Sequence, residues 1–282
     1  MSLVYLGTSD FAAGMLRRLC DAGHRPGLVV TRPDRPAGRG RRLTAPPVAT
    51  EAEALGLELY QPDDVNSEEA VERIGAAEPR LLVVCAYGAL VGAPLLDRYE
   101  ILNVHPSLLP RWRGAAPIER SIMAGDEETG VAIMRLTEGL DSGPVGLMAS
   151  EPVRPDDTWG SLSARLEELG ARLLVEAIES PPEYREQDEA GVTWAEKIAA
   201  ADRTIDPSWP ADRQERLVRA LSPHVGARLE LPDGTFLGVL EAHVEDGRLV
   251  PNRVLPPGGR EMGWEEYLRG HGDPFGGGSP DG

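Results

Sequence analysis

The 282-residue sequence has almost no lysine: Lys197 is the only one, although arginine is frequent. Lysine and arginine together number 29 against 46 aspartates and glutamates, which gives a formal net charge of -17. A protein that coats nucleic acid with a general basic surface needs the opposite balance, so the composition excludes that class. The excess of acidic groups does not exclude a local basic site.

Long apolar runs and paired cysteines are missing as well. No stretch of about 18 apolar residues occurs, as a membrane-spanning helix requires, and MSLVYLGTSDF lacks the basic and apolar regions of a signal peptide. Cys20 and Cys85 lie far apart inside apolar segments, which predicts buried thiols in a reducing compartment. We therefore expect a cytoplasmic protein that is neither exported nor inserted in a membrane.

The sequence also lacks the dinucleotide-binding fingerprint and the phosphate-binding loop motif, and its histidines do not have the spacing of metal ligands. LGTSDF has neither the glycines nor the spacing of a dinucleotide fingerprint, and GxxxxGK[ST] does not occur. The histidines are scattered, with no cysteine or paired-carboxylate spacing near them: His24, His105, His224, His243 and His271. We expect no metal site.

Short apolar runs alternate with helical patterns over the first half of the chain, which predicts an α/β fold with a mostly parallel sheet. We expect strands at residues 2–7, 27–31, 57–61, 80–86, 101–105, 130–136 and 145–151. We expect helices from Ser9 or Asp10 to Gly23, and at 48–56, 67–77, 116–124 and 158–179.

The sequence changes character after ESPPEY, residues 179–184, where paired prolines end a helix. The segments ARLEL, TFLGVLEAHVED and GRLVPN are typical of short strands, and PDG and EDG turns separate them, so we expect a small antiparallel β domain. The predicted organisation is an α/β domain at 1–182, a linker at 183–200, the β domain at 201–270 and a disordered tail at 271–282.

Polar side chains interrupt the apolar strand ILNVH, residues 101–105. Side chains alternate across a strand, so Asn103 and His105 share a face, and Pro106 forces an extended or turning backbone after them. Ligands of open α/β sheets bind at the carboxyl ends of the strands. The alternative is that the two side chains only anchor the next loop, and the pattern alone does not decide between them.

A third polar residue, Asp141, follows the next predicted strand in the turn GLDSGP. Its carboxylate can point at the same sheet edge. Asn, His and Asp suit acid–base chemistry at a carbonyl carbon: an amide donor stabilises an oxyanion by typically ~10² to 10³ in rate, and an imidazole moves protons for roughly 10² to 10⁴ more. The carboxylate would hold the ring and a water in place, or pair with the charged ring.

The motif NVHPSLLPRWRGAAPIERSIMAGDEETGVAIMRL, together with GLDSGP, closely resembles the methionyl-tRNA formyltransferase family. LGTSDFAA, TRPDRPAGRGRRL and VVCAYGALV resemble the same family in order and spacing, so that the likeness covers residues 1–200. One-carbon transferases of the purine pathway share the Asn, His and Asp pattern, but they do not share the PDRPAGRG loop.

The resemblance implies a Rossmann-like domain, followed by an OB-like one, that passes the formyl group of 10-formyltetrahydrofolate to the α-amine of initiator methionyl-tRNA. Asn103, His105 and Asp141 match the catalytic trio. The matched folate-contacting residues are Ser107, Leu108, Leu109 and Pro110, with Ala86, Tyr87 and Gly88 in the pterin pocket. The matched tRNA-gripping residues are Arg39, Arg41 and Arg42. We expect a monomer that acts in translation initiation.

Three side chains in these motifs suggest other roles. Ser107 lies two residues after His105, but no GxSxG elbow surrounds it and the family uses no covalent serine intermediate, so we do not expect a nucleophile. Cys85 is expected to be a core thiol. Trp112 is expected to cover its loop rather than stack on a base.

The resemblance weakens in the carboxyl-terminal domain. TFLGVLEAHVED passes directly to GRLVPN, so a segment that the family normally has between them is expected to be missing. Residues 201–282 contain nine Arg against fourteen Asp and Glu, a poor balance for binding phosphates. The basic loop RPDRPAGRGRR, residues 32–42, is either the main tRNA contact or a solvated surface loop. Two alternatives stay open: a formyltransferase acting on a sugar-nucleotide amine, and a non-catalytic folate- or RNA-binding relic.

Overall fold

The computed structural model describes residues 2–37 and 42–275, which form two compact units. The first unit comprises Met1–Pro117, Thr129–Pro152 and Ser163–Ala195, and the second comprises Ile118–Glu128, Val153–Leu162 and Glu196–Gly282. The domain boundaries predicted at 182, 200 and 270 stay predictions. Of the predicted tail, residues 276–282 lie outside the described part of the chain.

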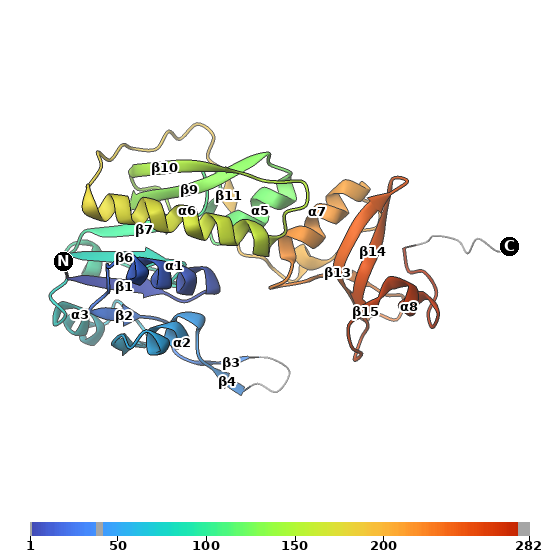
Figure 1. Ribbon diagram of the computed structural model, residues 1–282, viewed down its shortest axis with the longest axis horizontal. Helices are drawn as coiled ribbons and strands as arrows, with labels where there is room; N and C mark the ends of the chain where they lie inside the picture. The colour runs from blue at the N-terminus through green and yellow to red at the C-terminus, as the bar shows by residue number, and fades with distance from the viewer. Residues whose placement is uncertain (1, 38–41, 276–282) are drawn as a thin grey trace. The chain divides into compact units, whose positions relative to one another are not determined.

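A seven-stranded sheet in the order β10-β9-β7-β6-β1-β2-β5 forms the centre of the first unit (Figure 1). The strands are β1 (Leu3–Gly7), β2 (Leu28–Val30), β5 (Leu59–Tyr60), β6 (Leu81–Cys85), β7 (Ile101–His105), β9 (Glu128–Arg135) and β10 (Val145–Pro152). The five strands from β7 to β5 pair in parallel, and β9 runs antiparallel to β7. The mostly parallel α/β fold predicted from the sequence is confirmed.

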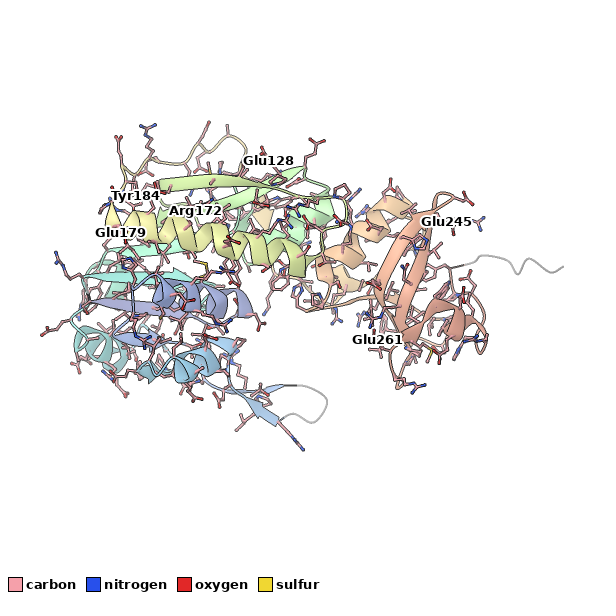
Figure 2. All side chains as sticks on the ribbon, in the orientation of Figure 1. Glu128, Arg172, Glu179, Tyr184, Glu245 and Glu261 are labelled. Atoms are coloured by element: carbon pink, nitrogen blue, oxygen red, sulfur yellow. The ribbon has the colours of Figure 1, made fainter. Side chains whose placement is uncertain are left out.

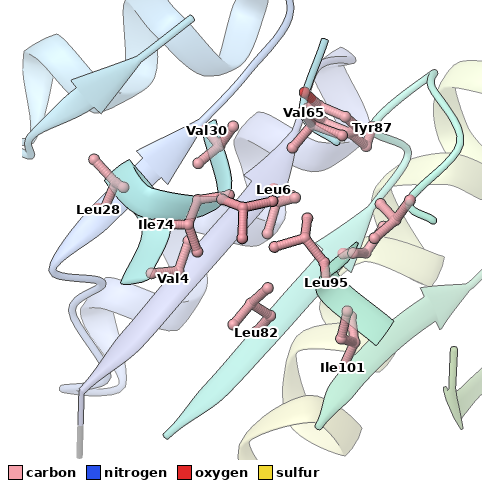
Figure 3. Close-up of a cluster of buried hydrophobic side chains, with 13 residues drawn as sticks. Val4, Leu6, Leu28, Val30, Val65, Ile74, Leu82, Tyr87, Leu95 and Ile101 are labelled. Carbon is pink, nitrogen blue, oxygen red and sulfur yellow. The ribbon is translucent and has the colours of Figure 1, made fainter. Parts of the chain in front are cut away.

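The central strands are apolar throughout because helices cover both faces of the sheet. Alternate residues such as Val4 and Leu82 face α3 (Glu68–Gly75) and α4 (Ala93–Leu96) in one core cluster (Figure 3). Tyr5 points to the opposite face, where its hydroxyl donates a hydrogen bond of 2.6 Å to the Ala12 carbonyl. On that face lie α1 (Asp10–Asp21) and α6 (Trp159–Glu179).

Helix ends follow local sequence signals. The side chain of Ser9, one of the two predicted helix starts, caps α1, and Gly23, just past its end, has the left-handed φ of +91° that favours glycine. The remaining helices of the first half are α2 (Pro47–Ala54) and α5 (Pro117–Ala124), within a few residues of prediction. In the first unit, helix α4 and four short strands were not predicted: β3 (Arg35–Ala37), β4 (Arg42–Thr44), β8 (Arg113–Gly114) and β11 (Trp194–Ala195).

The second unit contains the expected antiparallel sheet. Its strands pair in the order β12 (Ala227–Glu230), β13 (Phe236–Glu245), β14 (Arg248–Leu255) and β15 (Met262–Gly263). In this unit the short strand β15 and two helices were not predicted: α7 (Ala211–Leu221), which packs its apolar face against this sheet, and α8 (Trp264–Leu268). Phe275 contacts the Trp264 ring edge-on. No helix within the described residues is long and apolar enough to cross a membrane.

Candidate active site

Strand β7 holds two of the three predicted catalytic residues, and both side chains are buried. Asn103 is 6% exposed and His105 is 4% exposed. The strand lies between β6, where Val84 pairs with Asn103, and β9, where Ala132 pairs with His105. Since side chains alternate along a strand, Asn103 and His105 share one face at its carboxyl end.

Asp141 lies in the turn between β9 and β10, in an unusual backbone conformation. Its φ is +47°, in the left-handed region that aspartate tolerates better than most residues. The same turn contains Gly143, where a Cβ atom would lie 2.0 Å from the carbonyl oxygen of Arg135. Only glycine therefore lets this turn fold back so closely on the end of β9.

The Asp141 carboxylate joins the three residues. Its Oδ1 accepts a hydrogen bond of 3.3 Å from Nδ2 of Asn103, and its Oδ2 lies 3.6 Å from Nδ1 of His105. Oδ2 also accepts a hydrogen bond of 2.8 Å from the backbone N–H of Gly114. The structure thus brings the predicted trio together at one end of β7.

The other nitrogen of the His105 ring binds the backbone. Nε2 donates a hydrogen bond of 2.8 Å to the carbonyl oxygen of Trp112. Trp112 itself has a left-handed φ of +63°, and its backbone N–H donates to Oγ1 of Thr193 at 2.9 Å. Its ring lies against Arg111, whose guanidinium carbon is 4.3 Å from the ring centre. The role of the Trp112 carbonyl had no signal in the sequence.

The segment Ser107 to Pro110 follows β7 directly. Ser107 is fully buried, and its hydroxyl donates a hydrogen bond of 2.6 Å to the Arg111 carbonyl, which agrees with the absence of a nucleophilic role. Leu109 packs with Ala132 and Met134 of β9. The folate contacts assigned to these residues by resemblance stay predictions.

The segment Ala86, Tyr87 and Gly88 follows β6, the neighbour of β7. Ala86 and Gly88 are exposed and have positive φ values of 43° and 77°. Tyr87 instead lies in the core cluster, and its carbonyl accepts a hydrogen bond of 2.7 Å from Thr8. The pterin contacts assigned to this segment by resemblance stay predictions.

The two cysteines are buried and unpaired, as predicted. Burial raises the pKa of the Cys85 thiol to about 12, and the neighbouring Tyr5 hydroxyl lowers it only in part. A thiol of such high pKa carries little thiolate near neutral pH, so it is a poor nucleophile.

The basic loop is described only in part. Arg42 is exposed on β4, whereas Arg39 and Arg41 lie outside the described residues. The hairpin of β3 and β4 follows β2, which β1 and β6 separate from β7 in the sheet. The tRNA contact assigned to these arginines stays a prediction.

One further residue contacts the site from a segment that was predicted to be a linker. Nε2 of Gln187 donates hydrogen bonds of 2.8 Å to the carbonyl oxygens of Asp141 and Gly143. No motif in the sequence indicated this role. Across residues 2–37 and 42–275, no group of three His, Cys, Asp or Glu side chains is placed to hold a metal ion.

Comparison with known proteins gives the family of this chain. Residues 1–178 match the formyl transferase family. A methionyl-tRNA formyltransferase of Halorhodospira halophila (strain DSM 244 / SL1) is 45% identical over 297 aligned residues, which cover 95% of this chain and 96% of the relative. Because this alignment is longer than the 282 residues of the chain, the relative contains segments that this chain lacks.

Two solved structures share the fold at identities too low to show more than that. HypX from Aquifex aeolicus in complex with tetrahydrofolic acid aligns with a TM-score of 0.68 at 17% identity, over 95% of this chain and 47% of that one. A sugar N-formyltransferase from Shewanella sp FDAARGOS_354 aligns with a TM-score of 0.65 at 18% identity, over 87% and 98%. Given the family match and the 45% identical relative, the chain belongs to the methionyl-tRNA formyltransferase family of formyl transferases.

Proposed function

We propose that this chain transfers the formyl group of 10-formyltetrahydrofolate to the α-amine of initiator methionyl-tRNA, for translation initiation in the cytoplasm. The observation that carries the chemistry is the contact of one carboxylate, that of Asp141, with both Asn103 and His105. The acceptor rests on the 45% identity with a methionyl-tRNA formyltransferase. The amine nitrogen bonds to the formyl carbon, the bond from that carbon to N10 of the folate breaks, and the amine proton ends on N10.

The acceptor amine makes a modest demand on the site. A free α-amine has a pKa of about 7.7 to 8.0, against about 10.4 for lysine, so a useful fraction is neutral at pH 7. A strong base is therefore not needed. The site must instead stabilise negative charge on the formyl oxygen and carry a proton from one nitrogen to the other.

Asn103 suits the first task. Its amide has two N–H donors, and the contact with Asp141 uses one of them. In the proposed mechanism the second N–H binds the formyl oxygen as charge develops there. The carboxylate fixes the amide plane beforehand, and such preorganised donors contribute typically about 10² to 10³ in rate.

His105 suits the second task. The hydrogen bond from Nε2 to the Trp112 carbonyl fixes the ring, so Nδ1 is the nitrogen that exchanges a proton. The distance of 3.6 Å from Nδ1 to the Asp141 carboxylate exceeds a direct hydrogen bond. Nδ1 is therefore not hydrogen-bonded directly to the carboxylate. When Nδ1 holds the proton, the negative charge of the carboxylate balances the positive charge of the ring.

The substrates occupy the sheet edge around the trio in this proposal. Ser107 to Pro110 and the exposed residues Ala86 and Gly88 hold the folate, which supplies the activated formyl group. Arg39, Arg41 and Arg42 bind phosphates of the acceptor stem, because arginine neutralises phosphate and Arg42 is exposed. We propose that the protein acts as a monomer.

A second candidate acceptor is the amine of a sugar nucleotide, favoured by the fold shared with the Shewanella enzyme. The protein is incubated with 10-formyltetrahydrofolate and either charged initiator tRNA or an amino-sugar nucleotide, and the products are identified by mass spectrometry. Formyl-methionine is the expected product. A formylated sugar beside unmodified methionine would establish the second candidate, and no product from either acceptor would restore the non-catalytic alternative.

A further inference from the structure

A bridging segment, residues 185–195, lies against both loops that surround the Asp141 carboxylate. It begins after Tyr184 (Figure 2), whose ring lies 4.1 Å below the guanidinium of Arg135. Arg185 then exchanges two backbone hydrogen bonds with Val145, of 2.8 and 3.0 Å. At its other end the segment forms β11, which pairs with β8. Both ends of the bridging segment are thus hydrogen-bonded to other parts of the first unit.

Within this segment, both the nitrogen and the oxygen of the Gln187 side-chain amide form hydrogen bonds to residues outside the segment. Nε2 donates to the carbonyl oxygens of Asp141 and Gly143, both at 2.8 Å. Oε1 accepts a hydrogen bond of 3.0 Å from Nε of Arg113. Arg113 is only 3% exposed and also pairs with Glu189 at 3.1 Å.

The two carbonyls belong to a turn that needs support. The left-handed φ of Asp141, +47°, is unfavourable for a residue other than glycine, so neighbouring contacts must hold it. A rotation of this turn would move the carboxylate away from Asn103 and His105. One amide group, that of Gln187, fixes the turn on both sides of Ser142.

The bridging segment holds the opposite loop as well. The backbone N–H of Arg113 donates to the Thr193 carbonyl at 3.0 Å, and that of the next residue, Gly114, donates to the Asp141 carboxylate at 2.8 Å. Through Arg113, Gln187 therefore contacts both loops that bind the carboxylate.

We propose that Gln187 is a positioning residue for formyl transfer, which holds the turn at 141–143 so that the Asp141 carboxylate reaches Asn103 and His105. Gln187 touches no reacting atom and acts through Asp141. The effect on catalysis rests on the proposed function, whereas the effect on the geometry of the trio does not.

Steady-state kinetics of Gln187→Ala and Gln187→Glu test the catalytic effect. Glutamate has the size of glutamine but presents an acceptor to the two carbonyls. We expect kcat to fall about 10- to 100-fold in both variants, as for a small misplacement of a catalytic group, with KM for both substrates unchanged. In an Asp141→Ala background, Gln187→Ala lowers kcat no further, because its effect passes through the carboxylate.

Gln214→Ala is the matched control. Gln214 is a buried glutamine of the second unit, whose Nε2 also donates to two carbonyls, those of Trp209 at 2.7 Å and Pro207 at 3.4 Å. The control lowers Tm and leaves kcat at the wild-type value. If Gln187→Ala behaves like the control, or if the Gln187 and Asp141 effects on kcat multiply, the positioning role is wrong.

A spectroscopic measurement tests the geometry of the trio independently of enzymatic activity. The ring ¹⁵N signals of His105 are recorded by NMR for the wild type, Asp141→Ala, Gln187→Glu and Gln214→Ala. We expect Gln187→Glu to move these signals in the direction of Asp141→Ala and Gln214→Ala to leave them in place. Unmoved signals in Gln187→Glu would overturn the positioning role. A wild type that forms no formylated product would overturn the proposed function instead, and the His105 signals would still decide the role of Gln187.

Discussion

Nδ2 of Asn103 lies 3.3 Å from Oδ1 of Asp141, so the end of β7 and a turn 38 residues further along meet in one polar contact. The amide is oriented by the carboxylate, and the carboxylate is held in turn by Gly114, 2.8 Å away. Loop anchoring and catalysis both use such contacts. What separates the two roles is their effect on turnover, which substitution of each member of the trio measures.

Asn103→Ala is expected to lower kcat for formyl transfer by about 10² or more, the loss typical of an oxyanion donor. Asn103→Asp should be as inactive, because it replaces the donor by an acceptor next to Asp141. Single-turnover assays with saturating substrates measure the chemical step directly. A folded Asn103→Ala variant with wild-type turnover would leave only the anchoring role.

His105→Ala should lower kcat by about 10² or more, since the ring carries the proton between the two nitrogens. Added imidazole is expected to restore part of the activity of this variant, but none of that of Asn103→Ala, which keeps its ring. Rates are measured over a series of imidazole concentrations. Equal responses of the two variants would argue against proton transfer by His105.

A comparison of Asp141→Ala with Asp141→Asn separates the effect of the carboxylate charge on turnover from the effect of backbone strain on stability. Both should lower kcat by about 10² or more, because both remove the carboxylate. Asparagine accepts the left-handed φ of +47° more readily, so only the alanine variant should lose about 1 kcal/mol of unfolding free energy to strain. Urea unfolding measures this difference. Near-normal turnover in either variant would remove Asp141 from the mechanism.

Gly143→Ala should disturb the same turn by a steric route. Its Cβ would lie 2.0 Å from a backbone oxygen, so the turn must shift, at a cost of about 1–3 kcal/mol in stability together with a lower kcat. Gly27→Ala is the control, because its Cβ would meet nothing closer than 3.9 Å. Thermal unfolding and kcat are compared for the two variants. Equal effects would show that the turn has room to adapt.

The basic loop is tested through salt dependence. Alanine at Arg39, Arg41 or Arg42 should raise KM for charged tRNA and reduce the slope of log affinity against log salt by about 0.7–0.9 for each phosphate that the variant no longer neutralises. KM for the folate should not change. Arg80→Ala removes one exposed charge before the amino end of β6 and serves as the control. An unchanged slope in the loop variants would favour a solvated loop, and with it the sugar acceptor.

Burial of Cys85 predicts a loss of stability in alkali. Its pKa is raised from 9.0 to about 12, so between these values the unfolded chain loses a proton that the folded chain keeps. The stabilisation is complete below pH 9 and is lost as the pH rises towards 12, by up to about 1.4 kcal/mol per pH unit. Urea unfolding at pH 8 and pH 10 should show a steeper fall for the wild type than for Cys85→Ala. Equal slopes would contradict this prediction.

Much of the first unit was predictable because its strands are near-continuous apolar runs between clear helix signals. ILNVH was assigned to residues 101–105, the bounds that β7 has in the structure, since Pro106 ends the run. The hairpin of β3 and β4 was missed because its strands are only three residues long and contain arginine and proline, with Thr44 as the only β-branched residue. Helix α7 was missed because the strand patterns that follow it led us to expect an all-β domain.

The site was only half predictable for a different reason. Asn103, His105 and Asp141 are side chains in recognisable motifs, whereas Trp112 and Gly114 contribute backbone groups that any residue possesses. Gln187 lies in a segment without periodicity, and its position depends on the tertiary contacts of Arg113 and Val145. Such contacts leave no local pattern in a single sequence.

The most direct test of the proposed function is the mass of the methionine released from initiator tRNA after incubation with this protein and 10-formyltetrahydrofolate. We expect formyl-methionine from the wild type and, under the same conditions, about 10²-fold less from Asn103→Ala. Unmodified methionine from the wild type would contradict the proposed acceptor.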